Sequence, residues 1–99
     1  MSVFGMRLKA ARLAAGLSQE QLGLQAGFGV ESASARMNRY ERGTRAPAVE
    51  LVERIGAVLN LPVAYFYATD EDEATLLRVF HRMTGKERET LLAELPSDL

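Results

Sequence analysis

Glycine, asparagine and proline residues divide this chain into short segments in which apolar residues recur at the spacing of an α-helix. The first segment carries an i, i+4, i+7, i+11 pattern formed by Phe4, Leu8, Ala11 and Ala15. Gly16 follows this pattern and predicts the end of a helix over about residues 3–15. Since no stretch alternates apolar and polar residues long enough to predict a strand, we expect an all-α fold.

Capping residues predict where the next two helices begin. Ser18, with Gln21 three residues later, has the pattern of a capping box, and Gly27 ends that helix near residue 26. The third helix is expected to begin at about residues 31–32 and to end at 42–43, where the second residue is a glycine.

A fourth helix and a short fifth helix follow. Pro47 suits the first turn of the fourth helix, Asn60 suits the left-handed position at its end, and Pro62 opens the fifth, which runs through residues 65–66. The fourth helix is expected to bury Leu51, Val52, Ile55, Val58 and Leu59.

Two further helices are predicted near the end of the chain. The acidic run 70–73 places negative charge at the positive end of a helix that reaches about residue 82. Thr84 and Glu87 form a second capping-box pattern, which starts a last helix to about residue 95. We therefore expect a five-helix domain over 1–68 and a C-terminal helical extension over 69–99.

Charge is distributed unevenly along the chain. Residues 1–45 carry seven Lys and Arg against three Glu, whereas residues 46–99 carry five Lys and Arg against ten acidic residues. A basic first half and an acidic second half indicate that one face meets phosphate and another lies away from it. Solvated helix faces with a chance asymmetry are the alternative interpretation.

Composition argues against several classes of function. The chain has 99 residues, the size of one domain, and its 47% hydrophobic and 25% charged residues are ordinary for a globular protein. It has no cysteine, which excludes disulfides and zinc–thiolate sites, and we expect no metal or cofactor. The acids at 70–73 are consecutive and His81 is a lone histidine, so we do not expect an enzyme. No signal peptide or membrane span is predicted, which favours a cytoplasmic protein.

The second and third predicted helices carry the motif GLSQEQLGLQAG, which is followed by NRYERG and then a proline. This arrangement resembles the Cro/repressor-type (XRE-like) helix-turn-helix family over about residues 4–67. The matching residues are Arg12, Gly16, Leu17, Ser18, Gln19, Leu22, Gly27, Tyr40, Glu41, Gly43, Pro47, Leu51, Ile55, Leu59 and Phe66. The resemblance implies a lambda-repressor-like DNA-binding domain at the bacterial nucleoid.

The function implied by the resemblance is sequence-specific binding of double-stranded DNA by a transcriptional regulator. We expect a repressor that acts as a homodimer on a palindromic operator. The alternative is an antitoxin-like module, which binds a toxin as a protein partner and also binds its own operator.

The resemblance makes the third helix the recognition helix, whose outward side chains enter the major groove. With Met37 facing the core, a rotation of 100° per residue places Ala33, Tyr40 and Glu41 on the same side. Outward Arg and Asn side chains suit guanine and adenine edges. The residues expected to contact DNA are Ser18, Gln19, Ser32, Ser34, Ala35, Arg36, Asn38, Arg39, Arg42, Thr44 and Arg45.

Three polar residues have positions to which the family gives specific roles. Gln19 matches a position that clamps a DNA phosphate at the start of the second helix. Arg12 and Glu41 match a buried ion pair between the first and third helices, which orients the third. A solvated side chain is the alternative for each of them.

The turn before the third helix departs from the family pattern. About ten residues usually separate the turn glycine from the helix-3 glutamate, whereas Gly27 and Glu41 are fourteen apart. The four extra residues either start the helix one turn earlier or lengthen the turn.

The last two predicted helices carry more large apolar residues than a closed domain would leave uncovered. These residues are Leu76, Leu77, Phe80, Met83, Leu91, Leu92 and Leu95. We expect them to form the contact between two copies of the chain. The alternative is that they fold back on the first and fifth helices of their own chain.

Overall fold

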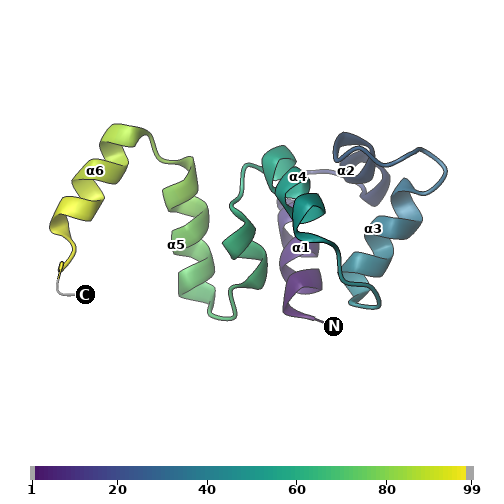
Figure 1. Ribbon diagram of the computed structural model, residues 1–99, viewed down its shortest axis with the longest axis horizontal. Coiled ribbons are helices and arrows are strands. Elements are labelled where there is room, and N and C mark those ends of the chain that lie inside the picture. Colours follow the sequence, from purple (N-terminus) through teal and green to yellow (C-terminus); the bar gives the residue numbers. More distant parts are fainter. Residues whose placement is uncertain (1, 98–99) are drawn as a thin grey trace.

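The computed structural model describes residues 2–97, and every regular element within that range is a helix (Figure 1). The elements are α1 (Val3–Ala14), α2 (Gln19–Gln25), α3 (Ala33–Arg42), α4 (Val49–Leu59), the 3₁₀ helix η1 (Val63–Tyr67), α5 (Glu71–Arg82) and α6 (Gly85–Glu94). The expected all-α fold, with five short helices followed by a helical extension, is confirmed. Among these described helices, none is long and apolar enough to cross a membrane.

Local sequence signals set several helix ends as expected. Both capping boxes are formed, one by Ser18 with Gln21 and the other by Thr84 with Glu87. Asn60 ends α4 in the left-handed conformation, with φ 55° and ψ 52°. These signals act through the backbone of neighbouring residues, so they operate without help from the rest of the fold.

Three local expectations were wrong. Pro47 lies outside the first turn of α4, because Ala48 is the extended N-cap and the helix begins at Val49. Ala15 is exposed rather than buried, because α1 ends before it and the residue lies beyond the core, at a cavity beside α5. Val58 is half-buried, because the rotation of the helix puts it about 90° from the centre of the buried face.

The apolar core lies among α1, α2, α3, α4 and η1. The largest fully buried side chains are Phe66, Leu8, Leu22, Met37, Ile55 and Val52. Burying one such side chain stabilises the fold by about 1.5–3 kcal/mol. The ring of Phe66 lies 5.7 Å from that of Phe4 and 5.5 Å from that of Tyr65, so η1 closes the core against α1.

The four extra residues lie in the connection between α2 and α3 and do not lengthen α3. α2 ends at Gln25 and α3 begins at Ala33, eight residues before Glu41. Phe28 anchors this connection in the core. The two helices cross closely at Gly23, where an added Cβ would lie 2.9 Å from the Cβ of Ala33.

α5 and α6 extend the molecule to one side, giving overall dimensions of 49 × 24 × 22 Å (Figure 1). α5 packs on the core through Ala74 and Leu77, whereas α6 has no buried residue. Arg88 of α6 donates to the carbonyl oxygens of Phe80 and His81, which belong to the end of α5. α6 is therefore joined to α5 and makes no buried contact with the core.

Candidate DNA interface

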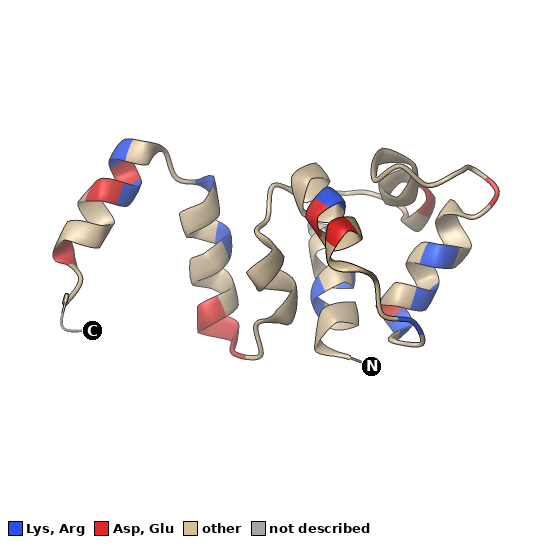
Figure 2. Cartoon of the chain, viewed as in Figure 1, with Lys and Arg blue, Asp and Glu red and all other residues tan. Residues whose placement is uncertain are grey.

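α3 separates a buried face from an exposed basic face. The buried residues are Ala33, Met37, Tyr40 and Glu41, as the helical rotation predicts. Ala35, Arg39 and Arg42 are exposed, and Figure 2 shows basic residues along this helix. The side chains that point outward are therefore available to a partner, while the inward ones hold the helix in place.

A buried ion pair joins α1 to α3. Nε of Arg12 donates to Oε2 of Glu41 at 2.5 Å, and Nη2 donates to Oε1 at 3.1 Å. A third donor of the guanidinium, Nη1, reaches the carbonyl oxygen of Leu17 at 2.9 Å. Because both carboxylate oxygens are bound by a planar fork, a rotation of α3 about its axis would break the pair.

Gln19 connects α2 to the same network. Its Nε2 donates to Oδ1 of Asn38 at 3.2 Å and to Oε1 of Glu41 at 3.1 Å. The side chain is half-buried between α2 and α3. Its amide donors are engaged within the protein, so a phosphate contact from this residue would require at least one of these bonds to be exchanged.

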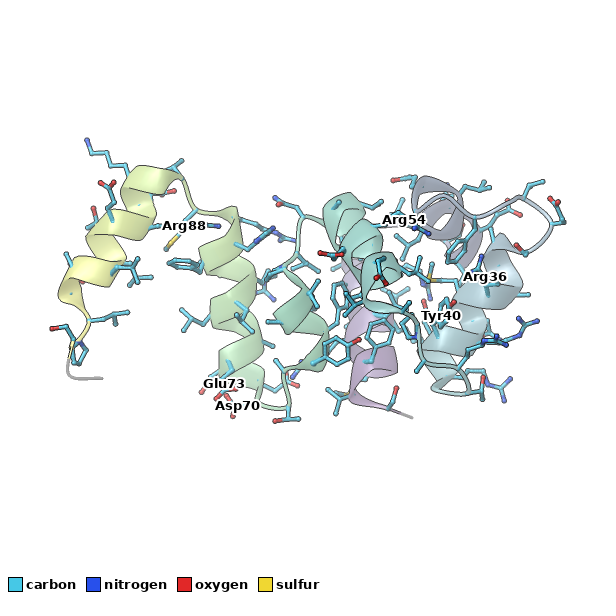
Figure 3. The ribbon with its side chains drawn as sticks, in the orientation of Figure 1. Arg36, Tyr40, Arg54, Asp70, Glu73 and Arg88 are labelled. Atoms are coloured by element: carbon cyan, nitrogen blue, oxygen red, sulfur yellow. The ribbon has the colours of Figure 1, made fainter. Side chains whose placement is uncertain are left out.

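Two aromatic residues hold Arg36 at the flank of α3. Its Cζ lies 4.0 Å from the ring centroid of Phe28. Its Nη2 donates to the hydroxyl of Tyr40 at 3.3 Å, and Figure 3 shows these two side chains on α3. Phe28 comes from the lengthened turn, whereas Tyr40 comes from α3 itself. A guanidinium over an aromatic face is attracted by the ring quadrupole, so this arginine is oriented before any ligand arrives.

Arg36 also borders a small basic hollow beside α3. The hollow has a volume of about 250 Å³ and is lined by Arg36, Arg39, Tyr40 and Arg45. Three guanidinium groups line it without an acidic side chain, and the arginine fork matches phosphate oxygens. This arrangement is suited to the backbone of a nucleic acid.

A model of the helix-turn-helix family matches residues 8–66, more than half of the chain. The chain belongs to the helix-turn-helix family. The resemblance expected from the sequence is thereby confirmed, with α2 and α3 as its two helices.

Similar proteins extend this assignment. The crystal structure of the transcriptional regulator BswR is similar with a TM-score of 0.84 and 42% sequence identity, covering 90% of this chain and 88% of that one. Coverage of that extent reaches beyond the helix-turn-helix domain into the α5–α6 extension. Uncharacterized HTH-type transcriptional regulators of Sinorhizobium medicae and Rhizobium meliloti are each 32% identical over 63 residues, or 64% of this chain. The match spans 42% of the length of those two relatives.

The other expected DNA contacts lie around the two helices of the helix-turn-helix. Ser34 and Ala35 are exposed on α3. Three hydroxyl groups are engaged with the backbone: Ser18 caps α2, Ser32 donates to a carbonyl oxygen in the turn, and Thr44 donates to one in α3. These three side chains therefore stabilise the local backbone in addition to any contact with DNA.

The contact between Arg36 and the ring of Phe28, which forms a platform beneath the guanidinium, was not predicted from the sequence. Phe28 lies eight residues earlier in an irregular connection, so no helical period relates the two residues. The available signal was a large aromatic residue placed directly after the turn glycine, Gly27.

The expected C-terminal apolar residues gather between α5 and α6. A groove of about 240 Å³ is lined by Leu76, Leu77, Phe80, Leu91, Leu92 and Leu95, and Met83 lies half-buried at the turn between the two helices. Leu76 is 57% exposed, Leu92 54% and Leu95 51%. Leu77 packs against the main core, whereas Leu76, Leu92 and Leu95 are open to solvent.

Proposed function

We propose that this chain binds double-stranded DNA sequence-specifically, as a transcriptional regulator that inserts α3 into the major groove. The observation that carries this proposal is the exposed basic face of α3, held in one rotation by the buried pair of Arg12 and Glu41. Arg39 and Arg42 are of the type that reads guanine, and Asn38 is of the type that reads adenine. Arg36 and Arg45 at the basic hollow, together with the start of α2, would bind phosphates.

We further propose that the regulator is a repressor that acts as a homodimer on a palindromic operator. A single recognition helix buries a small area, so proteins that use one usually bind as two-fold pairs. In this proposal residues 1–68 bind DNA, and residues 69–99 carry the dimer contact through the groove between α5 and α6. Repression would follow from exclusion of polymerase at the operator, in the bacterial cytoplasm.

Selection of bound sequences from a random duplex pool tests the DNA-binding proposal. We expect an inverted repeat whose half-sites are centred about one helical turn, 10–10.5 base pairs, apart. The selected duplex should bind at least about 10³-fold more tightly than a scrambled duplex at the same salt concentration. A pool without enrichment would rule out sequence-specific binding, whereas enrichment of one half-site would rule out the two-fold arrangement.

An antitoxin-like role is the second candidate, and the half-open groove between α5 and α6 is the observation that favours it. A toxin would occupy that groove instead of a second copy. Co-purification with the product of an adjacent toxin-like reading frame, lost when Leu92 is changed to glutamate, would support this role. A stable dimer in the absence of any such product supports the plain repressor.

A further inference from the structure

A cavity of about 500 Å³ separates α5 from α1. α5 is fastened near both of its ends. Arg7 donates to Glu71 at 3.0 Å, and Arg82 donates to the carbonyl oxygens of Leu59 and Asn60 at 3.0 and 3.1 Å. Between these attachments the wall on α1 is made of small side chains, namely Ala10, Ala11, Ala14 and Ala15. The two helices are thus held together with space left between them.

The lining of this α1–α5 cavity is basic although it lies partly in the acidic half of the chain. Arg7, Arg78 and Arg82 line it, against the single carboxylate of Glu71. Arg78 makes no side-chain hydrogen bond within residues 2–97. The side chain is half-buried and lines the cavity from α5, so its guanidinium is free to bind an anion there.

Arg7 supplies a second observation that points to a ligand. The side chain is 6% exposed, its Nε donates to the carbonyl oxygen of Ala68 at 2.9 Å, and Nη1 donates to Glu71. Nη2 is buried and has no hydrogen-bond partner among the described residues. A buried donor without an acceptor is costly, by about 1–3 kcal/mol in proteins generally. Arg7 lines the cavity, so a small turn of its guanidinium that uncovers Nη2 would let an acceptor in the cavity remove that cost.

We propose that the α1–α5 cavity binds a small organic acid, with its apolar body against the alanines of α1 and its carboxylate at Arg78 and Arg7. The volume lies within the range of small-molecule sites, and the combination of apolar wall and few charged groups is typical of them. Arginine binds carboxylates through paired N–H donors. Such a ligand contacts the helix-turn-helix domain and α5 at once. The site therefore gives the chain a means of responding to a metabolite, independently of whether it binds DNA.

Titration of the full chain with decanoate and 2-naphthoate tests the site, with decanol and 2-naphthol as neutral analogues of the same shapes. We expect saturable binding of at least one acid, followed calorimetrically and by shifts of amide resonances of α1 and α5. The matching alcohol should bind about tenfold more weakly or worse, since a charge-assisted contact is lost. Equal binding of acid and alcohol, no binding of either acid, or equally tight binding of inorganic sulfate would overturn the proposal.

Paired variants locate the binding. Arg78→Gln should weaken the acid about tenfold, and Ala14→Leu, which fills the cavity, should weaken it more. The matched controls Lys9→Gln and Ala57→Leu, both at exposed helical positions outside the cavity, should leave binding unchanged. Arg78 and Ala14 line the cavity and are not part of the buried core, so each variant should keep the melting temperature of the unsubstituted chain. Ala10→Leu fills the same cavity from a second position and should weaken the acid in the same way. If Leu92→Gln weakens binding as much as Ala14→Leu does, the acid occupies the groove between α5 and α6 and the proposal fails.

Discussion

At the scale of single residues, the arginines of α3 differ in how firmly they are held. Arg39 is exposed and makes no side-chain hydrogen bond within the described residues, whereas Arg36 lies against Phe28 and Tyr40. A free arginine can align with a base edge on binding, while a held one presents its charge at a set position. The two should therefore respond differently to substitution.

Arg39→Ala should weaken binding to the true operator by about 1–3 kcal/mol, the scale of a bidentate contact to a base. Binding to random duplex should fall much less, because that affinity comes from phosphate contacts. Fluorescence anisotropy with both duplexes at one salt concentration measures the difference. An equal loss on both would assign Arg39 to phosphate.

Phe28→Leu tests the platform beneath Arg36. Leucine keeps an apolar side chain in the core, so stability should change by less than about 1.5 kcal/mol. Operator affinity should fall by about 0.5–2 kcal/mol, because the ring that orients the guanidinium is gone. In an Arg36→Ala background the same substitution should cause no further loss of affinity. Additive losses in this double-mutant cycle would show that the two residues act separately.

Glu41→Ala tests the buried ion pair. Removing the carboxylate leaves the Arg12 guanidinium buried and uncompensated, so we expect a loss of about 3–5 kcal/mol in the free energy of unfolding. Glu53→Ala, at an exposed site on α4, should change it by less than about 0.5 kcal/mol. Urea unfolding of both variants measures the contrast. A similar small change in both would mean that Glu41 contributes no more than a surface charge.

At the scale of the helices, α1 and α3 cross closely at Gly5. A Cβ at Gly5 would overlap the carbonyl oxygen of Glu41 and lie 2.9 Å from that of Tyr40. The obstacle is backbone, which cannot move aside as a side chain can. Glycine is needed here for space rather than for an unusual φ, and this close approach lets Arg12 reach Glu41.

Gly5→Ala should therefore force α1 away from α3 and destabilise the fold by about 1–3 kcal/mol, the usual cost of overpacking. Gly85→Ala is the matched control, since nothing lies within 4 Å of an added Cβ at that helical position. There we expect a gain of about 0.4–1 kcal/mol from the reduced freedom of the unfolded chain. Thermal unfolding compares the two; a neutral Gly5→Ala would contradict the close crossing.

At the scale of the whole molecule, the basic face of α3 and the open groove between α5 and α6 lie at opposite ends of an elongated shape (Figures 1 and 2). A contact between two copies through the groove therefore leaves both recognition helices uncovered. The acidic residues of α5 and α6 lie away from the DNA-binding end. Half-sites one helical turn apart are about 34–36 Å from each other, so the proposed dimer reaches them when the long axes of its two copies lie side by side rather than end to end.

Leu92→Glu should convert the proposed dimer to a monomer, because it places a charge in the apolar contact. Light scattering should show half the mass of the unsubstituted chain, and operator binding should weaken. Leu13→Glu replaces an equally exposed leucine, 58% against 54%, on α1 and should change neither measurement. A dimer that survives Leu92→Glu would place the contact elsewhere, and so would an unsubstituted chain that is monomeric at micromolar concentration.

Features that depend on neighbouring residues could be predicted from the sequence. The two capping boxes and the left-handed Asn60 are local, because each involves only a few consecutive residues. The inward face of α3 followed from helical rotation about Met37. The partners Arg12 and Glu41 lie 29 residues apart and came from resemblance to a family, since no local pattern joins them.

Only the tertiary structure decided the features that depend on how far one helix lies from another. The fate of the four extra residues was open, because a longer helix and a longer turn satisfy the same sequence; the packing of Phe28 in the core settled it as a turn. The same packing brought Phe28 under Arg36. The cavity beside Ala14 exists because Arg7 and Arg82 hold α5 at a set distance, and such separations are fixed by contacts between residues far apart in the chain.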